Sequence, residues 1–259
     1  MTPSLNEDEA STRDETQARL RTVGYALVAP TTLAVAAALD LAELDPLRQA
    51  WEALPPDAYL RDGGRYRFRR HSCFTQSFEP VLLSAVAQRA HWQPTTYNAL
   101  HGGIERWFEP IESRVQSAPS WRQLLQALGS LFAQVLPVDR WYIEAHQFRI
   151  DTANGIGRPT PEGAHRDGVD FVAVILVERR NVKGGETHVF DANGPAGTRF
   201  TMHRPWTALL MDDARVIHET TPIQPEADGR PSDGRPAQPA FRDTLVLTYR
   251  KDGFQARQG

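Results

Sequence analysis

Apolar and polar positions divide the chain into a helical first half and a strand-rich second half. The clearest helix spans residues 120–136, where apolar side chains recur every three or four positions, Ser120 caps the start and Pro137 ends the run. Residues 169–177 are almost wholly apolar, so we expect a strand that is buried on both faces. Weaker patterns predict helices at 12–22, from Thr31 or Thr32 to 42 and at 46–54, and strands at 25–28, 63–78, 141–150, 187–190, 199–203, 207–211, 215–217 and 241–250.

The order of these elements indicates the fold class. Several short strands follow one another after Asp139 without intervening helices, which is typical of an antiparallel sandwich or barrel rather than a doubly wound sheet. We therefore expect an α+β chain whose N-terminal helices pack on one sheet. Residues 1–16 are expected to be a flexible tail, and residues 17–259 a single domain. Residues 224–240 are rich in Pro, Gly and Asp, which predicts a mobile loop, more simply a surface insertion than a lid.

Composition excludes several classes of protein. The 259 residues are 41% hydrophobic and 24% charged, as in a soluble globular protein with a real core. A mean hydropathy of -0.46, with no apolar run of about 18 residues, argues against a membrane span. A net charge of -3 gives no general attraction to nucleic acid or to an anionic membrane, so we expect a small-molecule partner. A single cysteine, Cys73, and an acidic, polar N-terminus favour the reducing cytoplasm, while the oligomeric state stays open.

Candidate chemistry begins at His165-Arg166-Asp167. In an extended segment, residues two apart point the same way, so this imidazole and this carboxylate could reach one ion. Two histidines and one carboxylate form the ligand set of non-haem Fe(II) oxygenases. A second histidine must come from further along the chain, where His188, His203 and His218 are available. His218 is preferred because it ends an apolar strand.

The last strand adds a candidate anion site. Arg242, Thr244 and Val246 share one face of the predicted strand 241–250, and a guanidinium beside a hydroxyl suits a carboxylate. An arginine that points into a barrel without an anion would be a costly unpaired charge. A surface ion pair for Arg242 is the alternative. Arg65, Arg67 and Arg69 also alternate along one strand face, as an anion site or, more simply, as a solvated edge.

With these residues in place the sequence resembles the Fe(II)/2-oxoglutarate-dependent dioxygenases, whose fold is a double-stranded β-helix, or jelly roll. Longer phrases resemble the bacterial branch that includes isoleucine 4-hydroxylase and acts on free L-amino acids. These phrases are Tyr97-Asn98, Gly102-Gly103-Ile104 with Arg106, Gln147-Phe148-Arg149-Ile150, Pro161-Glu162-Gly163, His165-Arg166-Asp167-Gly168 and Gly184-Gly185-Glu186-Thr187.

The resemblance implies a role for each matching position. His165, Asp167 and His218 would hold Fe(II), and Arg242 with Thr244 would bind the distal carboxylate of 2-oxoglutarate, the co-substrate used with O2. The long spacing between His218 and Arg242 departs from the family pattern and leaves Arg215 or Arg250 as substitutes for Arg242. The implied reaction is oxidation of an unactivated C–H bond of a free L-amino acid or a close derivative, coupled to decarboxylation of 2-oxoglutarate to succinate.

An amino-acid substrate requires a cation for its carboxylate and an acid for its ammonium group. Gln147 and Arg149 share a face of the strand before the metal motif, and Arg106 follows a glycine turn. Glu162 or Asp170 could take the ammonium group. A structural ion pair is the simpler interpretation of each of these residues, and for His71, His91, His101 and His146 the sequence gives no reason to expect more than surface or core roles.

Other functions stay open on the sequence alone. The same iron site could close a ring or desaturate the substrate, and a cupin-type metal dioxygenase would not use 2-oxoglutarate. A non-catalytic jelly-roll binding protein would leave the three expected ligands and the inward arginine unexplained. The sequence does not specify the amino acid, the carbon attacked or the stereochemistry.

Overall fold

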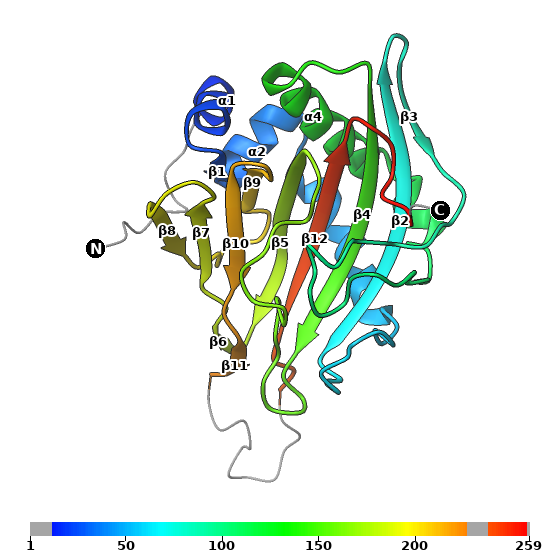
Figure 1. Ribbon diagram of the computed structural model, residues 1–259. Helices are drawn as coiled ribbons and strands as arrows, with labels where there is room; N and C mark the ends of the chain where they lie inside the picture. Colours follow the sequence, from blue (N-terminus) through cyan, green and yellow to red (C-terminus); the bar gives the residue numbers. More distant parts are fainter. Residues whose placement is uncertain (1–11, 227–237, 258–259) are drawn as a thin grey trace.

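The computed structural model describes residues 12–226 and 238–257 as an antiparallel jelly roll (Figure 1). Seven strands form the large sheet in the order β1-β9-β5-β12-β4-β2-β3. Their bounds are β1 Tyr25–Val28, β2 Arg67–Phe78, β3 Val81–Ala85, β4 Arg140–Asp151, β5 Phe171–Arg180, β9 Ala208–Asp212 and β12 Phe241–Arg250.

Smaller sheets lie against one half of the large sheet. Three strands pair in the order β10-β7-β8, with bounds Val216–Thr220, Thr187–Asp191 and Gly197–Phe200. Strands β6, Val182–Gly184, and β11, Ile223–Pro225, form a further pair. An apolar cluster that includes Val172 and Leu209 from the large sheet and Val189 and Val216 from the small one joins the two layers. The predicted sandwich is confirmed.

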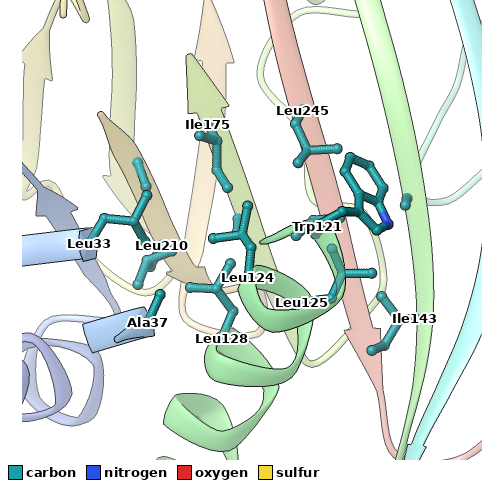
Figure 2. Close-up of a cluster of buried hydrophobic side chains, with 14 of the residues drawn as sticks. Leu33, Ala37, Trp121, Leu124, Leu125, Leu128, Ile143, Ile175, Leu210 and Leu245 are labelled. Atoms are coloured by element: carbon teal, nitrogen blue, oxygen red, sulfur yellow. The ribbon is translucent and has the colours of Figure 1, made fainter. Parts of the chain in front are cut away.

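Helices cover the opposite face of the large sheet. They are α1, Arg13–Thr22; α2, Pro30–Ala37; the 3₁₀ helix η1, Leu41–Ala53; α3, Ser113–Gln116; and α4, Pro119–Val135. Figure 2 shows Leu124, Leu125 and Leu128 of α4 directed at the sheet, where Ile143, Ile175 and Leu210 are among the facing side chains. Burying this apolar stripe is the main source of helix stability, because an isolated helix of this length is marginal in water. No helix in the described residues has the length and apolar character needed to span a bilayer.

Central strands therefore have two different faces. Along β12, Leu245, Leu247 and Tyr249 belong to the core under the helices, whereas Arg242 and Thr244 line a cavity on the other side. A strand alternates its side chains between faces, so one strand serves both the core and the site. The face predicted for Arg242 and Thr244 is confirmed.

Some predicted boundaries differ from the structure. Helix α1 starts at Arg13 with a capping box from Thr12, so the last residues of the expected tail are helical. Helix α4 begins at Pro119 after Ala118, and the Ser120 hydroxyl donates to the carbonyl of Glu43 instead of capping. The helix expected from Thr31 or Thr32 starts at Pro30 and ends at Ala37, and 46–54 falls within η1. Strands β3, β6 and β11 and helix α3 were not predicted. Residues 1–11 and most of the predicted loop 224–240, namely 227–237, lie outside the described residues.

Candidate active site

Two distant segments bring His165, Asp167 and His218 together. His165 pairs with His218 through two backbone hydrogen bonds of 3.0 Å, which attach the loop after β4 to strand β10. The Nε2 atoms of His165 and His218 each lie 3.9 Å from a carboxylate oxygen of Asp167. One potential ligand atom from each of the three residues lies within 4.8 Å of the others. That span is close to two metal–ligand bonds of about 2 Å, so one ion between these atoms fits the site.

Neighbouring groups orient these three side chains. The Nδ1 of His165 lies 2.9 Å from the Gly163 carbonyl, which accepts its proton and leaves Nε2 free to bind a metal. Gln93 donates its amide N–H to Asp167 Oδ1 at 3.1 Å. Burial and the nearby His165 hold the pKa of His218 well below its usual range, which favours the neutral imidazole that coordinates metals. The donor set and its supports fit a divalent first-row metal.

Arg242 is a buried cation that has no counter-ion among the described residues. Its side chain lines the cavity and is 4% exposed, and among the described residues no carboxylate lies within 4.0 Å of it. Burial lowers the pKa of Arg242 to about 10, which leaves the guanidinium charged at neutral pH. Thr244, two residues further along the same face of β12, also lines the cavity. The arrangement suits an incoming carboxylate, and the surface ion pair considered for Arg242 is absent from the described structure.

Two of the five candidate substrate residues line the cavity and three do not. Arg106 and Glu162 line the cavity, which encloses about 1060 Å³ when the solvent at its mouth is counted. Gln147, Arg149 and Asp170 do not line it. Arg149 binds Glu52 and Asp243 on the helix side of β4. Asp170 accepts the backbone N–H of Lys251 at 2.9 Å.

Gln147 and Arg149 lie on the face of β4 that is opposite to the cavity. The cavity face carries Glu144, His146 and Phe148, the alternate set to Gln147 and Arg149. Trp141, Ile143 and Ala145 on the odd-numbered face belong to the core, and Gln147 and Arg149 continue that face. Because these last two residues are polar, their type alone pointed to the cavity instead. His146 lies on the cavity face, although the sequence predicted only a surface or core role for it.

Two arginines predicted as an anion site or a solvated edge, and two residues that the sequence did not single out as site residues, also line the cavity. Arg67 and Arg69 line the cavity on β2, which is not the sheet edge, because β3 lies outside it. Asp57 forms ion pairs with both arginines, so the solvated-edge interpretation is wrong. His91 and Gln93 come from a segment without strand or helix periodicity, and no sequence pattern placed them at the site.

Comparisons with known proteins identify the class. The model of the 2OG-Fe dioxygenase family matches residues 48–248, so the chain belongs to this family. It is therefore an enzyme that uses Fe(II), 2-oxoglutarate and O2. No protein of curated function matches it significantly.

Three solved structures illustrate which proteins this chain is similar to. A bsmA homolog from Methylobium petroleophilum PM1 is 55% identical, with a TM-score of 0.91 over 97% of this chain and 98% of that one. IDO from Bacillus thuringiensis is 16% identical, with a TM-score of 0.73 over 96% of this chain and 100% of the other. The Fe(II)/(alpha)ketoglutarate-dependent dioxygenase TqaL is 19% identical, with a TM-score of 0.68 over 92% and 87% of the two chains. The last two share the fold with this chain.

Proposed function

We propose that the enzyme oxidises an unactivated C–H bond of a free L-amino acid or a close derivative, in the simplest case by hydroxylation. The observation that carries this proposal is Arg106, a buried cation in the cavity with no acidic partner in the part of the chain that the structure describes. The sequence phrases that resemble the branch acting on free L-amino acids support the same substrate class. Tyr97-Asn98 and Pro161-Glu162-Gly163 are among them. A cytoplasmic location is part of the proposal, in agreement with the buried free thiol of Cys73.

His165, Asp167 and His218 are the proposed iron ligands. With iron bound, the site would supply the oxidation that couples decarboxylation of 2-oxoglutarate to attack on the substrate C–H bond. Three protein ligands leave open coordination positions for the co-substrates. Arg242 and Thr244 are proposed to bind the distal carboxylate of 2-oxoglutarate, which supplies the counter-ion that the buried guanidinium lacks.

Arg106 is the proposed anchor for the substrate carboxylate. Its side chain is 2% exposed, and among the described residues it has no carboxylate within 4.0 Å. Its Nε has no hydrogen-bond partner there, and an Nη donates to Gln93 Oε1 at 2.9 Å. Because the same Gln93 amide donates to Asp167, a carboxylate held by Arg106 would sit in a fixed position relative to the iron ligands.

Glu162 is the proposed partner of the ammonium group. It lines the cavity, and its Oε2 is buried without a hydrogen-bond partner among the described residues. Its other carboxylate oxygen lies 3.5 Å from His165 Nε2, which places the acid beside the proposed metal. A cation and an acid in one cavity match the two charges of an amino-acid zwitterion.

The test measures succinate formation by the Fe(II)-loaded enzyme with 2-oxoglutarate and each of the twenty protein L-amino acids. At least one amino acid should raise succinate above the substrate-free rate and gain one oxygen atom, or lose two hydrogens if the product is cyclised or desaturated. Arg106→Leu should raise the KM for that amino acid about 30-fold or more, as expected when one partner of a buried charge pair is removed. Arg199→Leu, at an exposed arginine on β8, is the matched control. The proposal fails if no amino acid raises succinate formation.

A further inference from the structure

Four buried side chains on the cavity side of the sheet form a network that the proposed function does not use. His71, His91 and His146 all face the Oε2 atom of Glu144. The distances to this oxygen are 3.1 Å from His71 Nε2, 2.6 Å from His91 Nδ1 and 3.5 Å from His146 Nε2. His91, Glu144 and His146 line the cavity.

The ring geometry does not suit a second metal ion. His71 and His146 stack with ring centroids 4.6 Å apart and planes inclined by 20°. The lone pair of an imidazole nitrogen lies in the ring plane, so two nearly parallel rings do not aim at one ion. Arg69 also contacts His146 Nδ1 at 2.7 Å, and a guanidinium can only donate. His146 must therefore keep its proton on Nε2, the atom that a metal would need.

The hydrogen bonds assign the proton positions of the network. His146 accepts from Arg69 and donates from Nε2 towards Glu144. His71 donates from Nε2, and its Nδ1 is buried without a partner among the described residues, as expected for an unprotonated nitrogen. Burial opposes ionisation of Glu144, but His91 and the imidazole hydrogen bonds hold its pKa well below its usual range. Glu144 is thus an anion that accepts hydrogen bonds from surrounding imidazole N–H groups.

This network fixes the tautomer of His91. Glu144 accepts the Nδ1 proton of His91 at 2.6 Å, so the lone pair lies on Nε2. Burial lowers the pKa of His91 to about 3, which keeps the ring neutral. No residue in the described ranges hydrogen-bonds to Nε2, and the ring lines the cavity. His91 therefore offers a neutral hydrogen-bond acceptor to a molecule in the cavity.

His91 lies directly opposite Arg106. The two residues form an antiparallel bridge, with backbone N–H to carbonyl distances of 2.9 Å from His91 to Arg106 and 3.0 Å in return. Side chains of directly opposed residues leave the same side of such a pair, about 5 Å apart at Cβ. Both side chains line the cavity. A cationic donor thus stands beside a neutral acceptor, which matches a carboxylate and a donor group attached to one carbon atom.

We propose that His91, oriented by Glu144, accepts a hydrogen bond from the amino group of the substrate and thereby selects α-amino acids over carboxylic acids that lack a donor at that carbon. This inference rests on the proposed function, in which Arg106 binds the carboxylate and Glu162 balances the ammonium charge. His91 takes a second N–H of the same group. Its contribution is discrimination, because the unpaired Nε2 would be left without a donor when a deaminated analogue binds.

The test compares three ligands of one carbon skeleton on the Fe(II)- and 2-oxoglutarate-loaded enzyme under anaerobic conditions. They are an L-amino acid that stimulates succinate formation, its 2-hydroxy analogue and its 2-deamino analogue, with dissociation constants from calorimetry. Wild type should bind the deamino analogue about 10- to 100-fold more weakly than the amino acid, with the hydroxy analogue in between. His91→Phe should weaken binding of the amino acid by part of that factor, with the remainder due to Glu162, and leave binding of the deamino analogue almost unchanged.

Further variants separate recognition from a structural role. His91→Gln, which returns an oxygen acceptor, should recover part of the discrimination. Glu144→Gln should reduce discrimination with His91 in place. A glutamine amide can accept from Nδ1 or donate to it, so His91 is no longer held in the tautomer whose lone pair is on Nε2. His188→Phe is the matched control, since His188 also contacts two glutamates but lies outside the cavity lining.

Each outcome has one interpretation. Unchanged discrimination in His91→Phe and Glu144→Gln overturns the role of His91 and leaves the proposed function standing. If His91→Phe does not fold, the decision rests on His91→Gln and Glu144→Gln, and wild-type discrimination in both would overturn the role. If no amino acid binds or stimulates the wild-type enzyme, the proposed function and this inference fail together.

Discussion

Asp213 accepts the backbone N–H of Asp167 at 2.9 Å and so fixes the main chain of a proposed iron ligand from the turn after β9. Its second oxygen accepts the N–H groups of Gly168 and Val169 at 2.7 and 3.1 Å. One buried carboxylate therefore holds three successive backbone donors of the metal loop. Such outer supports keep a metal ligand oriented before the ion arrives.

Asp213→Asn should weaken iron binding without unfolding the protein. The amide retains one acceptor oxygen, but the other atom becomes an N–H₂ group that faces backbone donors. We expect the Fe(II) affinity to fall about 10- to 100-fold, the usual range for loss of such a support. Anaerobic Fe(II) titration measures it, with Asp212→Asn at the neighbouring carboxylate as the control. Equal affinities for Asp213→Asn and wild type would contradict the role.

Arg242→Leu should separate ligand binding from stability. Removing a buried cation that has no counter-ion within residues 12–226 and 238–257 should leave the unfolding temperature of the ligand-free protein equal to or above that of wild type. The affinity for 2-oxoglutarate should fall about 30-fold or more, because its distal carboxylate loses its charge partner. Calorimetric titration and thermal melts check the two effects. Arg180→Leu, at an exposed arginine of β5, should change neither, and a large loss of stability in Arg242→Leu would show that the arginine has a structural partner.

Leu128→Ala should destabilise the fold by about 2–5 kcal/mol, because the side chain is buried between α4 and the large sheet and its removal leaves a cavity. Val35→Ala is the comparison, since Val35 on α2 is 78% exposed, and its effect should stay within about 0.5 kcal/mol. Urea unfolding measures both. Similar free energies of unfolding for the two variants would mean that α4 does not pack as described.

His188 should give the protein a stability that is lost at high pH. Hydrogen bonds to Glu186 and Glu219 raise the pKa of His188 above its ordinary value of 6.5. A histidine whose pKa is higher in the folded than in the unfolded state stabilises the fold fully below pH 6.5. This stabilisation disappears as the pH rises through the folded-state pKa. The melting temperature of wild type relative to His188→Gln should therefore be highest near pH 6 and decline towards pH 9. A difference that stays constant over this range would contradict the assignment.

The sequence predicts an element correctly where a single physical requirement dominates the segment. The apolar run at 169–177 lies between two packed layers, and β5 there is buried on both faces. The stripe of α4 has a single apolar face, so its helix was clear. The 3₁₀ helix η1 was harder, because Pro46 lies inside it and removes a backbone donor from the regular pattern.

The residues of the candidate site also differ in how well the sequence predicts them. His165, Asp167 and His218 could be proposed because imidazole and carboxylate ligands are scarce and their spacing is meaningful. His91 and Gln93 could not, because they reach the cavity through a backbone bridge between two irregular segments. Their position depends on tertiary pairing that leaves no periodic signal in the chain.

The two-sided character of β12 makes the enzyme unusually convenient to re-engineer. Even-numbered positions from 242 to 250 line the cavity, whereas Leu245, Leu247 and Tyr249 pack beneath the helices. Val246 also packs against the apolar cluster between the two layers. Randomising Thr248 while Val246 and the odd-numbered residues stay constant would diversify the cavity lining and spare the scaffold. Selection for new substrates could then proceed on a library in which most members still fold.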